Sequence, residues 1–227
     1  AARRALAVAR ETMRIDVDLR AEGRDGALVR TVDGYRAHWD RWAEPWERQA
    51  LLKARPVAGD ADLGREFAEA AAAAVWERPF DAEAIRSVRA MKARTEHHAT
   101  VTDGPLDLKR TPGGIRDIEF SAQLLQLVHG PLDPALRVGG TVPALTALAD
   151  GGYVDDRDAG PLRDAYLLFR RIEHAVQLDE GHQTHAVPSD PDAHRRVARV
   201  VGLTSDARGT AAEHLDREVA ATRSAVR

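Results

Sequence analysis

The residues best suited to do chemistry lie in the stretch from Lys109 to Phe120. Lys109 precedes a turn that contains Gly113 and Gly114, and one arginine and two carboxylates follow: Arg116, Asp117 and Glu119. The glycines allow a tight turn and a close approach to another surface, and the start of the following helix would offer free amide donors to an anion. Carboxylates one turn inside that helix need a cationic partner, either a metal ion or an arginine.

A second acidic pair, Asp16 and Asp18, lies in the clearest strand pattern of the chain. Residues 13–20 alternate apolar and charged side chains, which predicts a strand, and residues 27–30 could form its partner. Both carboxylates would face the same side, as in the carboxylate clusters that hold Mg²⁺ where phosphoryl or nucleotidyl groups are transferred. The spacing leaves a plainer interpretation open, in which the pair lies on the solvated face of an exposed strand.

Cations on two predicted helices also have two interpretations. Lys53 and Arg55 end one helix, where the helix dipole favours cations in any protein and where they could also bind phosphate. Arg170 and Glu173 lie on a long helix and have the same ambiguity. A group of tryptophans within two helical turns is assigned to the core: Trp39, Trp42 and Trp46.

Helical periodicity dominates the rest of the chain. Capping residues, prolines and glycines divide it into helices, which are predicted at residues 31–42, 45–55, 60–76, 81–98, 115–129, 142–149, 158–178, 190–201 and 205–227. The sequence therefore predicts a mainly α fold, a helical bundle of about 7–9 helices, preceded by a small β-strand or hairpin. Residues 1–30 form the β-containing piece, and residues 31–227 form the bundle domain.

Composition excludes several classes of function. The 227 residues have a net charge of −3, no cysteine and no apolar run of membrane-spanning length. Thiolate metal sites are therefore excluded, and neither a broad nucleic-acid-binding surface nor a membrane span is expected. The first residues lack the pattern of a signal peptide, so we expect a cytoplasmic protein. The absence of an initiating Met suggests a fragment of a longer protein.

Four segments together resemble the bifunctional glutamine synthetase adenylyltransferase/adenylyl-removing enzymes. They are residues 14–26, 46–60, 109–130 and 165–188, in the order in which the family has them. The resemblance implies a whole enzyme with two nucleotidyltransferase domains, each followed by a helical bundle. This chain then corresponds to the end of one nucleotidyltransferase domain, including the strand with Asp16, and to the bundle that follows it.

Several residues indicate one half of that enzyme. Arg116, the segment from Arg170 to His174 and the loop Gln183-Thr184-His185 are similar to the N-terminal half. In the family, that half removes AMP from a tyrosine of glutamine synthetase by phosphorolysis and releases ADP, whereas the other half attaches AMP from ATP. The resemblance therefore implies the adenylyl-removing half.

The resemblance also implies roles for single residues. Asp16 matches the third metal-binding aspartate, which would hold Mg²⁺ or Mn²⁺, and Arg116 and Glu119 would act in catalysis by orienting phosphate or metal. The other implied contacts, to nucleotide (ATP or ADP) or to inorganic phosphate, come from Lys53, Arg55, Lys109, Gly113 and Gly114. The implied protein partners are glutamine synthetase and the PII signalling protein.

Two departures from the family pattern limit what the chain can do alone. The family's Gly-Ser motif with its pair of metal-binding aspartates does not occur before Asp16, and Ala21 replaces a proline. We therefore expect the isolated chain to be inactive. Three alternatives stay open. They are the adenylyl-attaching half, a docking or regulatory module that binds glutamine synthetase or the PII protein, and the related PII uridylyltransferase, which residues 46–60 and 113–120 fit less well.

Overall fold

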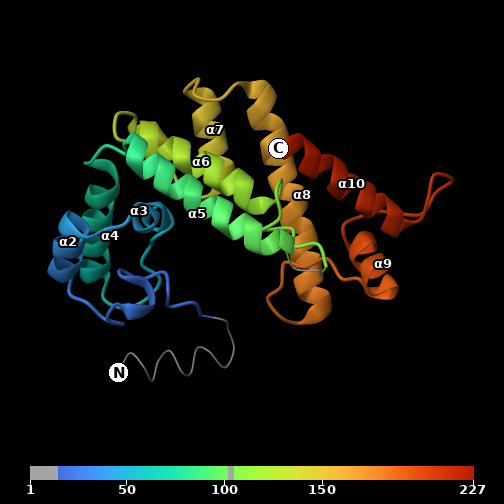
Figure 1. Ribbon diagram of the computed structural model, residues 1–227, viewed down its shortest axis with the longest axis horizontal. Helices are drawn as coiled ribbons and strands as arrows, with labels where there is room; N and C mark the ends of the chain where they lie inside the picture. Colours follow the sequence, from blue (N-terminus) through green and yellow to red (C-terminus); the bar gives the residue numbers. More distant parts are fainter. Residues whose placement is uncertain (1–14, 102–104) are drawn as a thin grey trace. The chain divides into compact units, whose positions relative to one another are not determined.

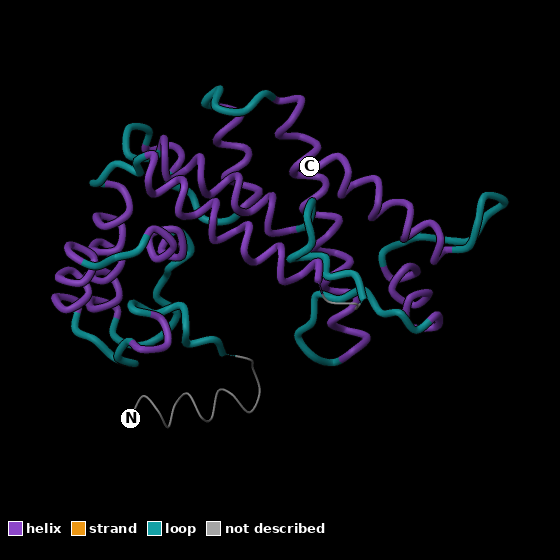
Figure 2. The backbone as a smooth tube through the Cα atoms, in the orientation of Figure 1, coloured by secondary structure: helices purple, strands orange, loops and turns teal. Residues whose placement is uncertain are grey.

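A computed structural model describes residues 15–101 and 105–227, the side chains of residues 95–101 excepted. Figure 1 shows its elements, which in chain order are η1 (Gly23–Asp25), α2 (Val32–Arg41), α3 (Pro45–Leu51), α4 (Ala61–Trp76), α5 (Ala82–Val101), α6 (Ile115–His129), η2 (Pro134–Leu136), α7 (Thr141–Asp150), α8 (Asp156–Glu180), α9 (Pro191–Val200) and α10 (Ala211–Val226). The described residues contain no strand (Figure 2). The predicted mainly α fold is confirmed.

The chain divides into two compact units. The N-terminal unit contains the residues up to Val88 together with Gln126–Gly139, and the C-terminal unit contains Arg89–Leu125 and Gly140–Arg227. The N-terminal unit thus includes residues on both sides of the domain boundary predicted at residues 30 and 31, and that boundary stays a prediction. No helix in the described part of the chain has the length and apolar character needed to cross a membrane.

Capping residues explain why most predicted helices begin where they do. The Thr31 hydroxyl accepts a hydrogen bond from the Gly34 amide at 3.0 Å, and the Asp60 carboxylate accepts one from the Leu63 amide at 2.8 Å. Asp190 caps α9 in the same way. Each cap satisfies an amide that has no partner in the first helical turn. The predicted bounds of α6, residues 115 to 129, match the structure.

The predicted strand and hairpin are absent from residues 15–30, which form turns and η1; residues 13 and 14 lie outside the described part. The Asp16 carboxylate accepts a hydrogen bond from the Asp18 amide at 2.8 Å, a local bond that competes with strand pairing. The Arg20 guanidinium donates to the carbonyls of Val17, Arg24 and Gly26. A two-stranded hairpin is marginal by itself, so these local bonds decide the conformation.

Three smaller predictions were wrong. Helix α3 ends at Leu51, so Lys53 and Arg55 lie in the exposed loop that follows it. Helix α10 begins only at Ala211, because Thr210 and Glu213 form a capping box there. Trp42 is not in the core, since 72% of it is exposed.

The core of the N-terminal unit forms where α2 and α3 pack against α4. Three aromatic rings meet at centroid distances of 5.2–5.7 Å: Tyr35, Trp39 and Phe67. They are surrounded by small side chains, including Ala70 and Ala71. The last carbonyls of α4 and those after it are capped by the Arg48 guanidinium, which donates to Val75, Arg78 and Pro79.

In the C-terminal unit, α8 packs against α7, α9 and α10. Its apolar stripe, which includes Phe169, Ile172 and Val176, is fully buried. Helix α6 contributes Ile115 and Ile118, which are also fully buried. This core fixes the face of α8 and the start of α6, the two elements that carry the candidate site.

Candidate functional site

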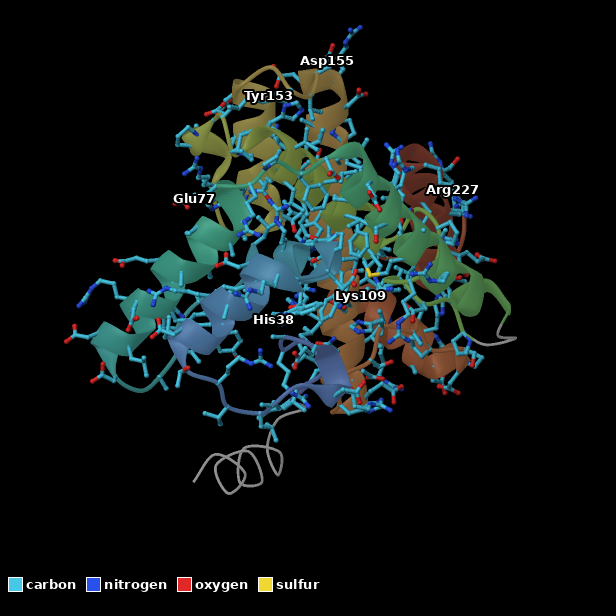
Figure 3. The ribbon with its side chains drawn as sticks, turned by 60° about the vertical axis from the view of Figure 1, so that its left-hand side comes forward. His38, Glu77, Lys109, Tyr153, Asp155 and Arg227 are labelled. Atoms are coloured by element: carbon cyan, nitrogen blue, oxygen red, sulfur yellow. The ribbon has the colours of Figure 1, made fainter. Side chains whose placement is uncertain are left out.

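Two distant segments pair just before α6. The amide of Leu108 donates to the carbonyl of His185 at 2.8 Å, the amide of Val187 donates to the carbonyl of Leu106 at 2.9 Å, and Asp107 forms an antiparallel bridge with Ala186. This short pairing places Lys109, which is labelled in Figure 3, beside the loop that carries His185. The side chain of Gln177 on α8 holds the same loop by donating to the carbonyl of Thr184 at 3.0 Å.

The two glycines before α6 are required by packing within the chain. Gly113 has φ +77°, and a Cβ atom there would lie 2.2 Å from the carbonyl oxygen of Arg223 on α10. A Cβ atom on Gly114 would lie 2.4 Å from the carbonyl oxygen of Leu108. Both positions therefore need glycine whether or not a ligand binds there, and a ligand contact by either glycine stays a prediction.

The amides at the start of α6 are not free, contrary to the expectation of an anion site there. The Gly113 amide donates to the Asp117 carboxylate at 2.6 Å. The amides of Gly114, Ile115 and Arg116 donate to carbonyls of the preceding loop at 2.9–3.1 Å. Asp117 also forms an ion pair with Lys92 at 2.8 Å, so its carboxylate has structural partners on two sides. Any anion bound near this turn would be held by side chains.

Glu173 on α8 is the centre of the candidate site. Its side chain is 1% exposed. Arg170 Nη1 lies 2.7 Å from its Oε2, and His185 Nδ1 is hydrogen-bonded to its Oε1. Burial alone would raise the pKa of Glu173, but the hydrogen bond from His185 and the charges of Arg170, His185 and Lys109 lower it below the usual value. The carboxylate is therefore ionised in the interior of the unit.

A second contact joins α6 to the same face of α8. The hydroxyl of Tyr166 lies 3.5 Å from Glu119 Oε1, and Tyr166 and Glu173 are seven residues apart, so both lie on one side of α8. On α6, the half-buried guanidinium of Arg116 lies 6.0 Å from the centre of the Phe120 ring. Burial and the neighbouring charge of Arg110 lower the pKa of Arg116. Within the described residues, Arg116 forms no ion pair.

The structure thus brings together, in the C-terminal unit, most of the predicted site residues: Lys109, Gly113, Gly114, Arg116 and Glu119. We call Lys109, Arg116, Glu119, Arg170, Glu173 and His185 the α6–α8 cluster. The other three predicted residues, Asp16, Lys53 and Arg55, belong to the N-terminal unit. All three are exposed there, and their predicted roles stay predictions. The described residues contain no group of three His, Asp or Glu side chains arranged to hold a metal ion.

Sequence reasoning left the role of Glu173 open and missed its pairing with His185. A signal was present, because Glu173 lies four residues after Phe169 and directly between Ile172 and the buried residues that follow. A carboxylate on the apolar stripe of a helix must have a buried partner. The partner itself could not be identified, since His185 lies in a loop beyond the end of the helix.

Comparison with known proteins gives the family. A family model described as glutamate-ammonia ligase adenylyltransferase matches residues 7–70, and one described as GlnD PII-uridylyltransferase matches residues 83–227. A bifunctional glutamine synthetase adenylyltransferase/adenylyl-removing enzyme from Streptomyces coelicolor is 47% identical over 192 residues, which cover 85% of this chain. Proteins of the same name are 48% identical in Cutibacterium acnes and 43% identical in Mycobacterium tuberculosis, over 83% and 90% of this chain. This chain belongs to the glutamine synthetase adenylyltransferase/adenylyl-removing enzyme family.

The chain spans about a fifth of the length of the curated relatives it matches, 19–21%. The α6–α8 cluster of this adenylyltransferase-family chain lies within the match to the PII-uridylyltransferase model, which includes residues 113–120. That segment therefore does not separate the two families. Residues 46–60 lie within the match to the adenylyltransferase model, as do Asp16, Lys53 and Arg55.

Proposed function

We propose that this chain is part of an enzyme that controls glutamine synthetase by reversible adenylylation. We assign it to the half that removes AMP from a tyrosine by phosphorolysis and releases ADP. The family supports the reaction class, and the similarity of Arg116, the segment from Arg170 to His174 and the loop at His185 to the N-terminal half supports the direction. The observation that carries the proposal is the gathering of cations in the α6–α8 cluster.

The charge of the cluster suits a phosphate ligand. Arg170, His185 and Lys109 all act on the single buried carboxylate of Glu173. In the described part of the chain, neither Lys109 nor Arg116 forms an ion pair with an acidic residue. Cations that are partly buried and not neutralised attract phosphate groups and bind them with charge-assisted hydrogen bonds. Both substrates of phosphorolysis, inorganic phosphate and the adenylyl group, carry such groups.

Within this proposal, three residues of the cluster have roles in binding the substrates: Lys109, Arg116 and Glu119. Lys109 and the turn at Gly113 and Gly114 would line the edge of the substrate cleft in the longer protein. Arg116 and Glu119 orient phosphate or the metal ion, with Tyr166 fixing the Glu119 carboxylate at 3.5 Å. The arginine suits an oxyanion because its planar guanidinium can donate two parallel hydrogen bonds.

Three residues of the N-terminal unit also have proposed roles, Asp16, Lys53 and Arg55. Asp16 is exposed and commits one carboxylate oxygen to the Asp18 amide, so its other oxygen fits the role of a single ligand to Mg²⁺ or Mn²⁺ in the longer protein. The ion would neutralise phosphate charge. Lys53 and Arg55, in the exposed loop after α3, would contact nucleotide or inorganic phosphate. One metal-binding carboxylate does not complete such a site, so the isolated 227 residues are expected to be inactive.

The direction of the reaction can be tested in a longer protein that contains this segment and its nucleotidyltransferase domain. With adenylylated glutamine synthetase and phosphate, it should release ADP. Formation of pyrophosphate from ATP and unmodified glutamine synthetase would instead assign the segment to the adenylyl-attaching half. Arg116→Ala and Glu119→Ala should lower the turnover and leave the melting temperature unchanged. Full turnover with a lowered melting temperature would make both residues structural.

A docking or regulatory module is the alternative function, with glutamine synthetase or the PII signalling protein as partner. Exposed apolar residues of α8 favour it, since Leu167 is 49% and Leu178 80% exposed. Against it, Glu173 on α8 is directed to His185 of its own unit. Replacing both leucines with serine distinguishes the functions, because a docking module would lose its partner and a catalytic bundle would keep turnover.

A further inference from the structure

We infer that His185 binds a phosphate oxyanion through Nε2–H and that Glu173 is the positioning residue that holds the ring at Nδ1. The inference rests on the proposed function for its kinetic test, but it concerns residues to which that function gives no role. It names the class of ligand, a phosphate group of inorganic phosphate or of a nucleotide.

The first argument is the state of the imidazole ring. Glu173 is 1% exposed and ionised, and its Oε1 accepts the hydrogen bond from His185 Nδ1. A carboxylate at one ring nitrogen fixes the proton there and stabilises the doubly protonated imidazolium. In that form Nε2 is also a donor. With Glu173 holding Nδ1–H, a ring that carries both protons presents Nε2–H as the donor for an oxyanion.

The second argument is that the ring is held in place and its outer nitrogen is free. The amide of Leu108 donates a hydrogen bond to the carbonyl of His185. The side chain of Gln177 donates one to the carbonyl of the preceding residue, Thr184. The His185 side chain is 16% exposed, which admits a ligand. Within the described residues, Nε2 has no hydrogen-bond partner. A histidine that served only to hold the loop would not need a donor at this position.

The third argument is the set of neighbours. Helix α8 presents Arg170 and His174, whose side chains lie 3.2 Å apart, in addition to Glu173. The loop before α6 contributes Lys109 near Glu173, while its Asp107 and Arg110 form a pair of their own at 3.6 Å. Two cations, Arg170 and Lys109, therefore act on the carboxylate that holds His185. An oxyanion with several acceptor oxygens, such as phosphate, matches this set.

The direct test needs no enzymatic activity. Inorganic phosphate, and separately AMP, is titrated into the 227-residue protein while the ¹⁵N resonances of the histidine rings are followed, with chloride at equal ionic strength as the reference. His185 Nε2 should shift in a saturable way with either ligand, and AMP alone would assign the site to nucleotide. His182→Gln, a change in the same loop, should leave the titration unaltered. No shift of His185 with either ligand would overturn the inference.

The kinetic test uses the full-length enzyme and separates binding from folding. His185→Ala should raise the KM for phosphate about tenfold, and His185→Gln should recover much of it, because the glutamine amide can donate from the position of Nε2. Glu173→Gln should also raise the KM for phosphate, because the ring loses the carboxylate that holds it at Nδ1. An equal rise of the KM in the Gln and Ala variants at residue 185 would contradict the inference.

The two proposals can fail separately. If the full-length enzyme makes no ADP but phosphate still shifts His185, the direction of the reaction is wrong and the binding role stands. If ADP is released and neither variant at residue 185 changes the KM for phosphate, the binding role is wrong and the proposed function stands.

Discussion

Among the described residues, each unit contains a buried glutamate bound to a histidine, and the two pairs differ in what surrounds them. In the N-terminal unit, Glu47 and His38 are 2.8 Å apart, and their side chains are 5% and 2% exposed. The other ring nitrogen of His38 lies 3.6 Å from a second carboxylate, that of Glu22. In the C-terminal unit, Glu173 is equally buried, but its histidine, His185, is partly exposed and cations lie around it.

The difference teaches how the same two residue types can serve packing or binding. His38 is enclosed between acidic groups, so no ligand can reach it. The interaction between His38 and Glu47 therefore serves to stabilise the fold. His185 has one nitrogen held by the buried carboxylate of Glu173, on which Arg170 and Lys109 also act, and its side chain is partly exposed. Burial of the carboxylate is common to both pairs, and the partial exposure of His185 and the cations at Glu173 distinguish the pair that we propose binds an anion.

The largest loss in the free energy of unfolding should come from breaking the enclosed pair, Glu47 and His38. Glu47→Ala leaves His38 buried without its closest partner, and loss of one member of a buried pair costs about 3 kcal/mol. Urea unfolding of the 227-residue chain, followed by circular dichroism, measures the free energy of unfolding. The phosphate response of His185 should persist wherever this variant is folded. A loss under about 1 kcal/mol would show that the enclosed pair is not the structural member of the comparison.

A somewhat smaller loss in the free energy of unfolding should follow a substitution at Gly113, in the turn beside the α6–α8 cluster. Gly113→Ala places a methyl group against the Arg223 carbonyl in a left-handed conformation, which should lower the free energy of unfolding by about 2 kcal/mol or more. Gly152→Ala is the matched control, because Gly152 has φ +72° with no atom within 4 Å of the added Cβ. It should cost about 1 kcal/mol. Equal losses would mean that the contact with α10 does not select glycine at residue 113.

Glu173→Gln should cost about 1 kcal/mol at neutral pH, less than the change at Glu47, because the amide can still accept from His185. The environment lowers the folded-state pKa of Glu173, so its charge stabilises the fold above the unfolded-state pKa. That contribution is lost as the pH falls through the folded-state pKa. The difference in stability between wild type and variant should therefore shrink below about pH 4. A difference that grows in acid would mean that the buried carboxyl is protonated.

The smallest effect is expected at a histidine without a buried carboxylate. His182 is exposed, and its Nδ1 lies 3.0 Å from the carbonyl of Glu180. His182→Gln should change the free energy of unfolding by no more than about 0.5 kcal/mol and should leave the KM for phosphate unaltered. An effect as large as that of His185→Ala would remove the distinction between the two histidines.

The sequence predicted those parts of the fold that depend on neighbouring residues. The caps at Thr31, Asp60 and Asp190, and the bounds of α6, follow from side chains within a few residues of each helix end. The strand predicted at Asp16 does not form, because its alternating pattern has no partner strand in the described residues. Local hydrogen bonds from the Arg20 guanidinium set the conformation instead.

The candidate site was predicted only on the α6 side. Lys109, Arg116 and Glu119 are close in sequence, so the sequence alone predicts that they lie near one another. Their association with Glu173 depends on the pairing of residues 106–108 with residues 185–187. No periodicity within either segment encodes that contact, because each half of the pairing is too short to give a strand pattern.

The central claim is that Glu173, and not Glu47, supports an anion site. Urea unfolding of the wild type, Glu47→Gln and Glu173→Gln, each with phosphate and with chloride at equal ionic strength, tests it most directly. Phosphate at ten times its Kd should stabilise the wild type and Glu47→Gln by about 1.4 kcal/mol, and Glu173→Gln by much less. Equal stabilisation of all three proteins, or its loss only in Glu47→Gln, would contradict the claim.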